Sequence, residues 1–273
     1  MKILDIKVED ALQFPFKKDN WLNTFGIYVL ITFLTSISIG ILVFFFLFAG
    51  LILLEVNLDI SAGSLMLFLI SALPCVLIFT LIQMYLQGYI LEVVGNIKNK
   101  EKEAIPRHGE IWRKIKLGFA QLILLLGPMS ISLIFLLLSI TIIVAGVTIL
   151  ESNLLLAIVL MIFGLLAIIT ASLTLLTTSV LIFPSMLYIY LEKRSIANAY
   201  CFKNIKVVLK NSWKEFLLLY AISIIVFFAI SIIGQIPLLG NLVFLFAIPY
   251  ITFVIAFVTG NIFKDIDKLK LFN

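Results

Sequence analysis

Histidine and cysteine are scarce in this chain: its 273 residues include one histidine and two cysteines. His108 alone cannot form a multi-histidine metal site, and no cluster of cysteines or carboxylates replaces one. The phosphate-binding glycine loop, the nucleophile elbow and the dinucleotide fingerprint are also missing from the sequence. We therefore expect no catalytic residues, no metal site and no cofactor. A membrane enzyme is the class of function that the sequence favours least.

Charged residues are also sparse, at 13% of the chain, whereas hydrophobic residues make up 63% and the mean hydropathy is +1.21. A soluble domain of this length does not carry so much apolar surface. Crossing a bilayer takes roughly 20 helical residues, and six apolar runs are long enough. They cover about 24–54, 64–91, 117–150, 154–191, 216–234 and 238–263. They predict an all-α, polytopic membrane bundle of six transmembrane helices, with kinks at Pro74, Pro128 and Pro184.

Basic residues are absent from three predicted loops, near 55–63, 151–153 and 235–241. All 20 Lys and Arg lie in four other segments, namely 1–20, 95–116, 192–214 and 264–270. The positive-inside rule therefore places these segments, and with them both termini, on the cytoplasmic side of the cell membrane. The sequence pI of about 9.1 then reflects membrane topology, so we expect no nucleic-acid partner.

The three tryptophans, Trp21, Trp112 and Trp213, occupy equivalent positions in the chain. Each closes a polar stretch that contains lysine and opens a long apolar run. Tryptophan favours the membrane–water interface, because its ring is apolar and its N–H needs a partner. The pattern predicts interfacial anchors at the entrances of three helical hairpins. The pattern also suggests that the hairpins form an internal repeat in a single membrane domain, 1–273, with units at about 11–97, 105–194 and 196–265.

A cytoplasmic amphipathic segment is predicted before each hairpin, and the third segment has the clearest pattern. Its basic residues recur at spacings of three and four, at Lys203, Lys206, Lys210 and Lys214. Its apolar residues form a second stripe, at Ala197, Cys201, Ile205, Val208 and Leu209. Such a segment can bury its apolar side at the lipid boundary while its lysines contact anionic headgroups. The alternative is that the lysines only obey the positive-inside rule.

Ionisable residues are absent from the predicted middles of the spans, which disfavours ion-coupled transport. The densest polar group lies near the end of the second span, at Gln83, Tyr85, Gln87, Tyr89, Glu92 and Asn96. It could form the inner mouth of a cavity, or it could hydrogen-bond between helices. A hydroxyl stripe on the fourth span consists of Thr170, Thr174, Thr177 and Thr178. Helix packing is its favoured interpretation, and a pathway lining is the alternative.

The stretch GYILEVVGNIKNK at 88–100 leads through Pro106 to Glu110-Ile-Trp112 and Gly118-Phe119. Together with the opening ALQFPFKKDNW at 11–21, it resembles an uncharacterised prokaryotic family, domain of unknown function four-thousand-thirteen. The resemblance covers most of the chain and implies a multi-pass membrane protein without an assigned activity. The C-terminal third has a looser likeness to the membrane portion of some glycerophosphodiesterases, which confers no enzymatic role.

Two functions stay open at this point. The favoured hypothesis is a non-enzymatic integral membrane protein. It associates through its cytoplasmic interface with membrane lipids, including anionic ones, or with partner membrane proteins or further copies of itself. The alternative is a transporter or channel-like protein for a small solute or lipid, because internal repeats and proline-interrupted spans recur in transporters. In that case, the polar face around Gln83 and Gln87 would line the path.

Overall fold

Every described segment of regular structure is helical in the computed structural model, which describes residues 8–17, 21–55, 62–101, 103–236 and 239–266. The α-helices are α1 (Val8–Gln13), α2 (Trp21–Glu55), α3 (Ala62–Lys98), α4 (Ile111–Ile149), α5 (Leu154–Thr177), α6 (Phe183–Lys193), α7 (Ile196–Ala199), α8 (Phe202–Gly234) and α9 (Leu239–Ile266). The 3-10 turn η2 (Phe14–Phe16) follows α1, and the π-helical turn η3 (Thr178–Ile182) joins α5 to α6. The all-α class is confirmed. Both chain termini, predicted to be cytoplasmic, lie outside the described residues.

Five of the described helical stretches are long and apolar enough to cross a membrane. They are Leu73–Lys98, Ile111–Ile149, Leu154–Lys193, Phe202–Gly234 and Val243–Ile266. A shorter apolar stretch, Thr24–Ser38, lies within α2. Large apolar side chains point outward on these helices: on α5, Leu155 is 77% and Phe163 is 61% exposed, as expected for surfaces that face lipid. The chain is a multi-pass membrane protein, and the described residues account for five of the six predicted spans.

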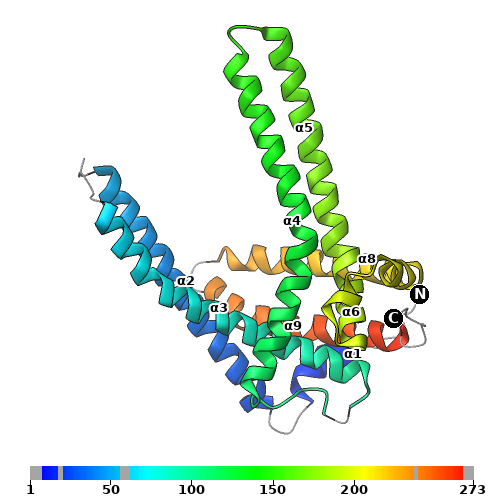
Figure 1. Ribbon diagram of the computed structural model, residues 1–273. Helices are drawn as coiled ribbons and strands as arrows, with labels where there is room; N and C mark the ends of the chain where they lie inside the picture. The colour runs from blue at the N-terminus through cyan, green and yellow to red at the C-terminus, as the bar shows by residue number, and fades with distance from the viewer. Residues whose placement is uncertain (1–7, 18–20, 56–61, 102, 237–238, 267–273) are drawn as a thin grey trace. The chain divides into compact units, whose positions relative to one another are not determined.

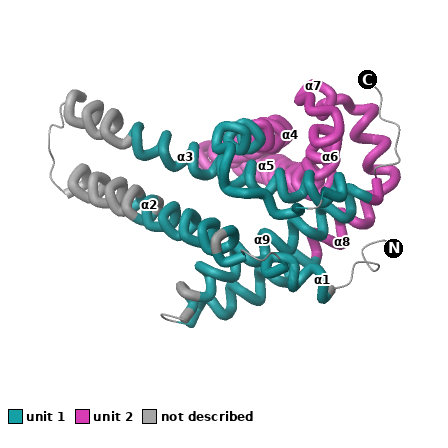
Figure 2. The backbone as a smooth tube through the Cα atoms, turned by 90° about the horizontal axis from the view of Figure 1, so that it is seen from below, with its two compact units in different colours: residues 1–119, 222–264 teal, residues 120–221, 265–273 magenta. Residues whose placement is uncertain are grey.

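The chain divides into two compact units, shown in different colours in Figure 2. Unit 1 comprises residues 1–119 and 222–264, and unit 2 comprises residues 120–221 and 265–273. Three helices contain residues of both units. The helix α4 begins in unit 1 and continues in unit 2, α8 runs from unit 2 into unit 1, and the last two residues of α9 belong to unit 2. The arrangement in three hairpin units and the internal repeat stay predictions.

Two glycines bring α3 and the start of α4 into backbone contact within unit 1. A Cβ atom on Gly88 of α3 would lie 1.7 Å from the carbonyl oxygen of Lys114. A Cβ atom on Gly118 of α4 would lie 1.8 Å from the carbonyl oxygen of Met84. The two helices therefore cross at a distance that leaves no room for any side chain on either glycine.

The helix α9 forms another side of the unit 1 core. Its Gly260 packs on α3, where an added Cβ would lie 2.7 Å from the Cβ of Ile97. Its Phe253 is 1% exposed, and the centre of this ring lies 5.2 Å from that of Tyr28 on α2 and 6.1 Å from that of Tyr89 on α3. Aromatic contacts of this kind add to the burial of the rings. They join α2, α3 and α9.

In unit 2, α4 and α5 lie side by side as an antiparallel pair (Figure 1). Small buried residues recur every seven positions along both members of the pair. They are Ser132, Ser139 and Gly146 on α4, Ala157, Gly164 and Ala171 on α5, and Thr178 at the start of η3. A Cβ on Gly146 would lie 3.2 Å from the carbonyl oxygen of Ala157, and Gly164 packs in the same way against α4. Because lipid supplies no hydrophobic force between helices, close packing of small residues holds the pair together. Seven-residue spacing favours a left-handed pair.

Two of the prolines at predicted kink sites, Pro128 and Pro184, lie in unit 2. The helix α4 continues through Pro128, beside which the hydroxyl of Tyr200 donates a 2.7 Å hydrogen bond to the carbonyl oxygen of Ile123. A Cβ on Gly127 would lie only 1.9 Å from that hydroxyl oxygen, so a side chain there would displace the tyrosine. Pro184 follows the π-helical turn η3, which inserts a wider turn before α6 begins.

The hydroxyl stripe of α5 and η3 is satisfied within its own helix. Thr170, Thr174, Thr177 and Thr178 each donate to the carbonyl oxygen four residues earlier, at 2.8–2.9 Å. A donor engaged in this way adds little polarity to the helix surface. These hydrogen bonds leave little polarity for a pathway lining. The packing interpretation stays a prediction, because Thr178 is buried but Thr170 and Thr177 are exposed.

The third amphipathic segment is not a separate surface helix, because α8 runs without a break for 33 residues, or about 50 Å. Its basic part therefore continues directly into its apolar part. The side chains buried on the basic part are Asn204, Ile205, Val208, Ser212 and Phe216. The apolar side that we predicted at the lipid boundary is thus covered by protein. Of the predicted apolar stripe, Ala197 is exposed on α7 and Cys201 is half-buried.

Candidate functional site

The most deeply buried polar site of unit 1 surrounds the end of α3 and the loop 99–110. Tyr89 has no exposed surface there, and Lys114 of α4 is 1% exposed. A lysine is almost never buried to this degree unless its charge is paired. We call this group the buried polar cluster, and it comprises Tyr28, Tyr85, Tyr89, Glu92, His108 and Lys114.

Glu92 compensates the buried charge of Lys114. Its Oε2 lies 3.3 Å from the Nζ of Lys114, and its Oε1 accepts a hydrogen bond from Arg113. The Nζ of Lys114 also donates to the carbonyl oxygen of Gly109 and lies 5.7 Å from the ring centre of Tyr89, within cation–π range. Glu92 is 8% exposed, so dissolved salt screens this ion pair weakly. Removing Glu92 would leave the charge of Lys114 buried without its carboxylate partner, whereas Glu92 keeps Arg113 as a partner if Lys114 is removed.

His108 connects the loop to α2 and α3. Its ring stacks on Tyr89, with ring centres 4.7 Å apart and planes inclined by 10°. Its Nε2 donates to the carbonyl oxygen of Thr24 at 2.8 Å, and its Nδ1 lies 2.8 Å from the hydroxyl of Tyr85. Burial lowers the pKa of His108; the hydrogen bond to Thr24 raises it by less, and the charge of Lys114 lowers it further. The neutral ring is favoured, and its Nδ1 can then accept a hydrogen bond from the hydroxyl of Tyr85, which also lies 3.0 Å from the carbonyl oxygen of His108.

Acid should weaken the fold through His108. Because its pKa in the folded protein lies below the ordinary value of 6.5, the unfolded chain binds the proton more readily as pH falls through this range. The free energy of unfolding should fall by less than about 1 kcal/mol between roughly pH 7 and 5, since part of the ring stays in water. Unfolding in SDS at a series of pH values measures it. His108→Gln should flatten this slope, and an unchanged slope would contradict the assignment.

Side chains of α3 hold the loop residues 103–106 in place. The hydroxyl of Tyr89 donates to the carbonyl oxygen of Pro106 at 2.9 Å, and Asn96 Nδ2 donates to that of Glu103 at 3.2 Å. Donors from α3 thus satisfy carbonyl groups of the loop backbone. In the part of the chain that the structure describes, no three His, Cys, Asp or Glu side chains are grouped so that they could hold a metal ion. The hydrogen bonds suit a structural role, in which α3 holds the loop against the helix.

The predicted polar face of α3 is in fact two faces. Tyr89 and Asn96 contact the loop and Glu92 contacts the start of α4, whereas Gln83 is half-buried and Gln87 is exposed. At about 100° per residue, the two glutamines point away from the other three side chains. The structure therefore brings three of the five candidate cavity residues together and leaves the glutamines apart. Because the five side chains do not share one face of α3, they cannot all line the same cavity mouth.

The four predicted lipid-binding lysines are all exposed on α8. They share one side of the helix with Phe202, which is 75% exposed, and Trp213, which is 44% exposed. The Nζ of Lys214 lies 5.6 Å from the ring centre of Trp213. At about 100° per residue, these six side chains fall within an arc of about 120°, opposite the buried side chains of the helix. We call them the basic stripe, which comprises Phe202, Lys203, Lys206, Lys210, Trp213 and Lys214.

The other two tryptophans stand at helix starts, as predicted. Trp21 is the first residue of α2; it is half-buried and meets Phe16 edge-on, with ring centres 5.2 Å apart. Trp112 is the second residue of α4 and is 72% exposed. Trp213 instead lies inside α8. The role of all three as interfacial anchors stays a prediction.

Lys114 and His108 were not predicted to be members of the buried polar cluster. Both lie in a stretch that reads as a hydrophilic loop followed by a basic helix start. The partners of His108 are distant along the chain, with Tyr85 23 residues away and Thr24 84 residues away, so no local spacing marks them. One signal was available for Lys114: it precedes Gly118 by one helical turn, and so it shares the face on which the helices cross.

Comparison with known families and proteins gives one match. A family model described as "Protein of unknown function (DUF4013)" matches residues 69–240, which include α4 to α8, most of α3 and the first two residues of α9. No curated protein and no solved structure matches the chain. The looser likeness to glycerophosphodiesterases therefore finds no support. The matched range contains the basic stripe, the α4–α5 pair and most of the buried polar cluster.

Proposed function

The chain belongs to the family described as protein of unknown function (DUF4013), and we propose that it is a non-enzymatic protein of the cell membrane that binds anionic lipid headgroups at its basic stripe. The observation that supports this function is the exposure of four lysines on the side of α8 opposite its buried residues. The proposal includes six spans in three hairpins with cytoplasmic termini. The 35-residue helix α2 supplies the span beyond the five already named.

Packing on the opposite side of α8 fixes the direction of the basic stripe. Val208 has no exposed surface and Phe216 is 1% exposed, so the helix cannot rotate without losing buried apolar contacts. The lysines are therefore held outward together. Each lysine near an anionic membrane surface contributes about 1 kcal/mol of attraction. Trp213 adds a ring suited to the interface beside two of them.

Position along α8 distinguishes the lysines from one another. The apolar part of the helix begins just after Lys214, and Lys210 lies about 6 Å before it along the axis. Lys203 lies about 16 Å before Lys214, which exceeds the Debye length of about 8 Å at physiological ionic strength. We therefore assign the larger share of headgroup attraction to Lys210 and Lys214.

Replacing the two inner lysines should reduce the preference for anionic lipid more than replacing the outer two. We expect Lys210→Gln with Lys214→Gln to lower this preference roughly tenfold, and Lys203→Gln with Lys206→Gln to lower it less than about threefold. Both variants lose the same charge, so each is the matched control for the other. The measurement is electron paramagnetic resonance of spin-labelled phosphatidylglycerol, with spin-labelled phosphatidylcholine as the neutral reference, around protein reconstituted in vesicles.

High salt provides a second check on the same samples. About 0.5 M NaCl should reduce the preference of the wild-type protein and have little effect on the inner double variant. If neither pair of substitutions altered the preference for phosphatidylglycerol, the lipid function would be lost. The lysines would then reflect the positive-inside rule alone, and docking of a partner protein on the basic stripe would be the next hypothesis to examine.

A further inference from the structure

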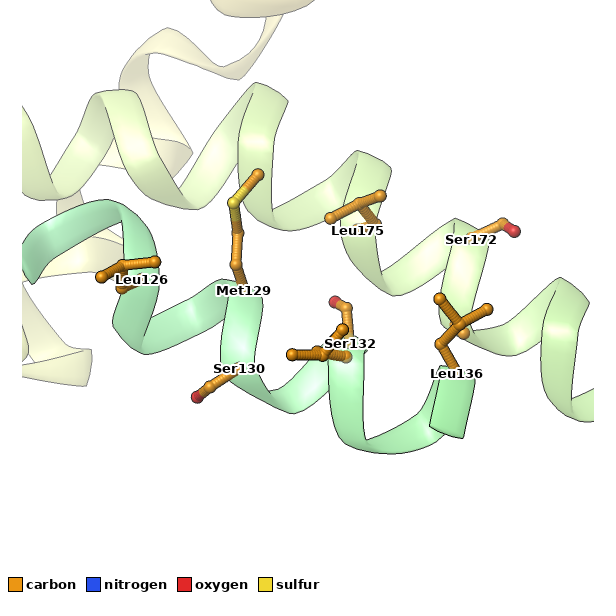
Figure 3. Close-up of a pocket in the computed structure, with 9 residues that line it drawn as sticks. Leu126, Met129, Ser130, Ser132, Leu136, Ser172 and Leu175 are labelled. Carbon is orange, nitrogen blue, oxygen red and sulfur yellow. The ribbon is translucent and has the colours of Figure 1, made fainter. Parts of the chain in front are cut away.

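A cavity of about 430 Å³ lies between α4 and α5 within unit 2 (Figure 3). Ligand pockets in proteins measure about 300–1,000 Å³, so this volume is sufficient for a small molecule. The lining of the cavity is mostly apolar and consists of four leucines, Met129, Ala171 and the three serines Ser130, Ser132 and Ser172. Leu126 is 54% and Leu133 is 56% exposed, which leaves the cavity open at the outer surface of the helix pair. In two spanning helices, that surface faces lipid.

The small-residue register of the pair explains why this space exists. The contacts of Gly146 and Gly164 set the antiparallel register, which places Ser132 of α4 level with Ala171 of α5. Both of these residues line the cavity. The small side chains of Ser132 and Ala171 thus face each other. Neither helix has a glycine at this level, so the backbones do not come close enough to close the space between them. The gap follows from the sequence of both helices.

Ser132 supplies a polar group inside this apolar space. The residue is 4% exposed, and its Oγ has no hydrogen-bond partner. Ser130, on the same helix, instead donates to the carbonyl oxygen of Gly127 at 2.7 Å. Figure 3 shows the hydroxyl of Ser132 directed between the two helices, whereas those of Ser130 and Ser172 point away. A buried hydroxyl without a hydrogen-bond acceptor costs free energy, and a bound molecule that supplies an acceptor removes this cost.

The position of Ser132 limits what can bind there. Along the helix, it lies about 24 Å from Lys116 and about 28 Å from Glu151, so a spanning α4 places it near the middle of the bilayer. Phospholipid headgroups and esters lie too far away to reach it, and a charged ligand would be strongly disfavoured at this depth. A carbonyl oxygen can accept a hydrogen bond from the hydroxyl of Ser132. A carbonyl group has no donor of its own, so it needs no further partner in the cavity.

We propose that this cavity binds an apolar, membrane-dissolved molecule that carries a carbonyl oxygen, to which Ser132 donates a hydrogen bond. The leucine walls contact the apolar parts of the molecule, and the opening toward lipid is its entrance. This binding site depends on α4 and α5 crossing the membrane and does not depend on the basic stripe. It is a function additional to headgroup binding.

The test uses the full-length protein in nanodiscs with two photoreactive probes. One is pentadecan-8-one with a terminal diazirine, and the other is pentadecane with the same diazirine. Mass spectrometry of the cross-linked peptides locates the labels. We expect the ketone to label α4 and α5 saturably, with competition from unlabelled pentadecan-8-one. Ser132→Ala should weaken the apparent affinity of the ketone about fivefold, as for the loss of one hydrogen bond, and leave labelling by the alkane unchanged.

Two further variants make the outcome decisive. Ser130→Ala removes a hydroxyl that points away from the cavity and should label like the wild type. Ala171→Leu fills the cavity and should abolish saturable labelling by both probes. Equal ketone affinity in the wild type and Ser132→Ala, or saturable labelling that survives Ala171→Leu, would overturn the proposal. The inner lysine variant should label normally, so failure of this site and failure of headgroup binding can be told apart.

Discussion

Gly118→Ala is expected to destabilise the protein by about 3 kcal/mol or more, and Gly88→Ala to have a similar effect. The new Cβ at position 118 would lie 1.8 Å from the carbonyl oxygen of Met84, and that oxygen belongs to a helix backbone. A side chain could rotate away, but here α3 and α4 must separate. Separation would also expose the buried Lys114 to partial hydration. The melting temperature of the detergent-solubilised protein, read from the surviving monodisperse fraction, measures the loss.

A glycine of the same unit provides the matched control. Gly26 lies in α2, and an added Cβ there has no atom within 4 Å outside its immediate surroundings. Gly26→Ala should leave stability unchanged or raise it by up to about 1 kcal/mol, because alanine is the better helix former. If Gly118→Ala and Gly26→Ala melted at the same temperature, the backbone crossing of α3 and α4 would be refuted.

Glu92→Ala is the other substitution with a large expected effect. It leaves the ammonium group of Lys114 buried without its carboxylate partner, which typically costs about 3–5 kcal/mol. Unfolding in SDS at constant lipid composition measures the difference from the wild type. Replacing both partners, as Glu92→Leu with Lys114→Met, removes the buried charges altogether and should recover most of the lost stability.

The ion pair between Glu110 and Arg113 is the control for this result. Its atoms lie 2.8 Å apart, but the Glu110 side chain is 63% exposed. Glu110→Ala should therefore change the free energy of unfolding by less than about 1 kcal/mol. An effect of Glu92→Ala no larger than that of Glu110→Ala would contradict a buried pair. A double variant as unstable as Glu92→Ala would contradict charge compensation as its role.

Apolar run length predicted most of the helices of this chain. The run at 117–150 corresponds to α4, which ends at Ile149 but begins six residues earlier, at Ile111. The early start has a tertiary cause, since the first turns of α4 pack on α3 through Gly118 and bury Lys114. The same applies to α8, whose basic part is helical because Val208 and Phe216 are buried. Hydropathy alone cannot detect helix that depends on such contacts.

The candidate site was only partly predictable. Tyr89, Glu92 and Asn96 stand out in the sequence as polar residues beside an apolar run, and the structure brings them together. Grouping them with Gln83 and Gln87 ignored the helical period, which separates the two sets. Their partners could not be inferred, because the path of the loop 99–110 decides which groups meet. Small residues seven apart on α4 and α5 were visible in the sequence, but their pairing needs the antiparallel register.

The threonine hydroxyls of α5 and η3 have a consequence for how the protein is made. Each donates to a carbonyl oxygen of its own helix, so these hydrogen bonds form as soon as the helix does. The segment can leave the translocon and enter lipid with these polar groups already covered, before any neighbouring helix arrives. Insertion and pairing are thus separate events in its biogenesis. Pairing then depends on shape, through Gly164 and the small residues that meet it.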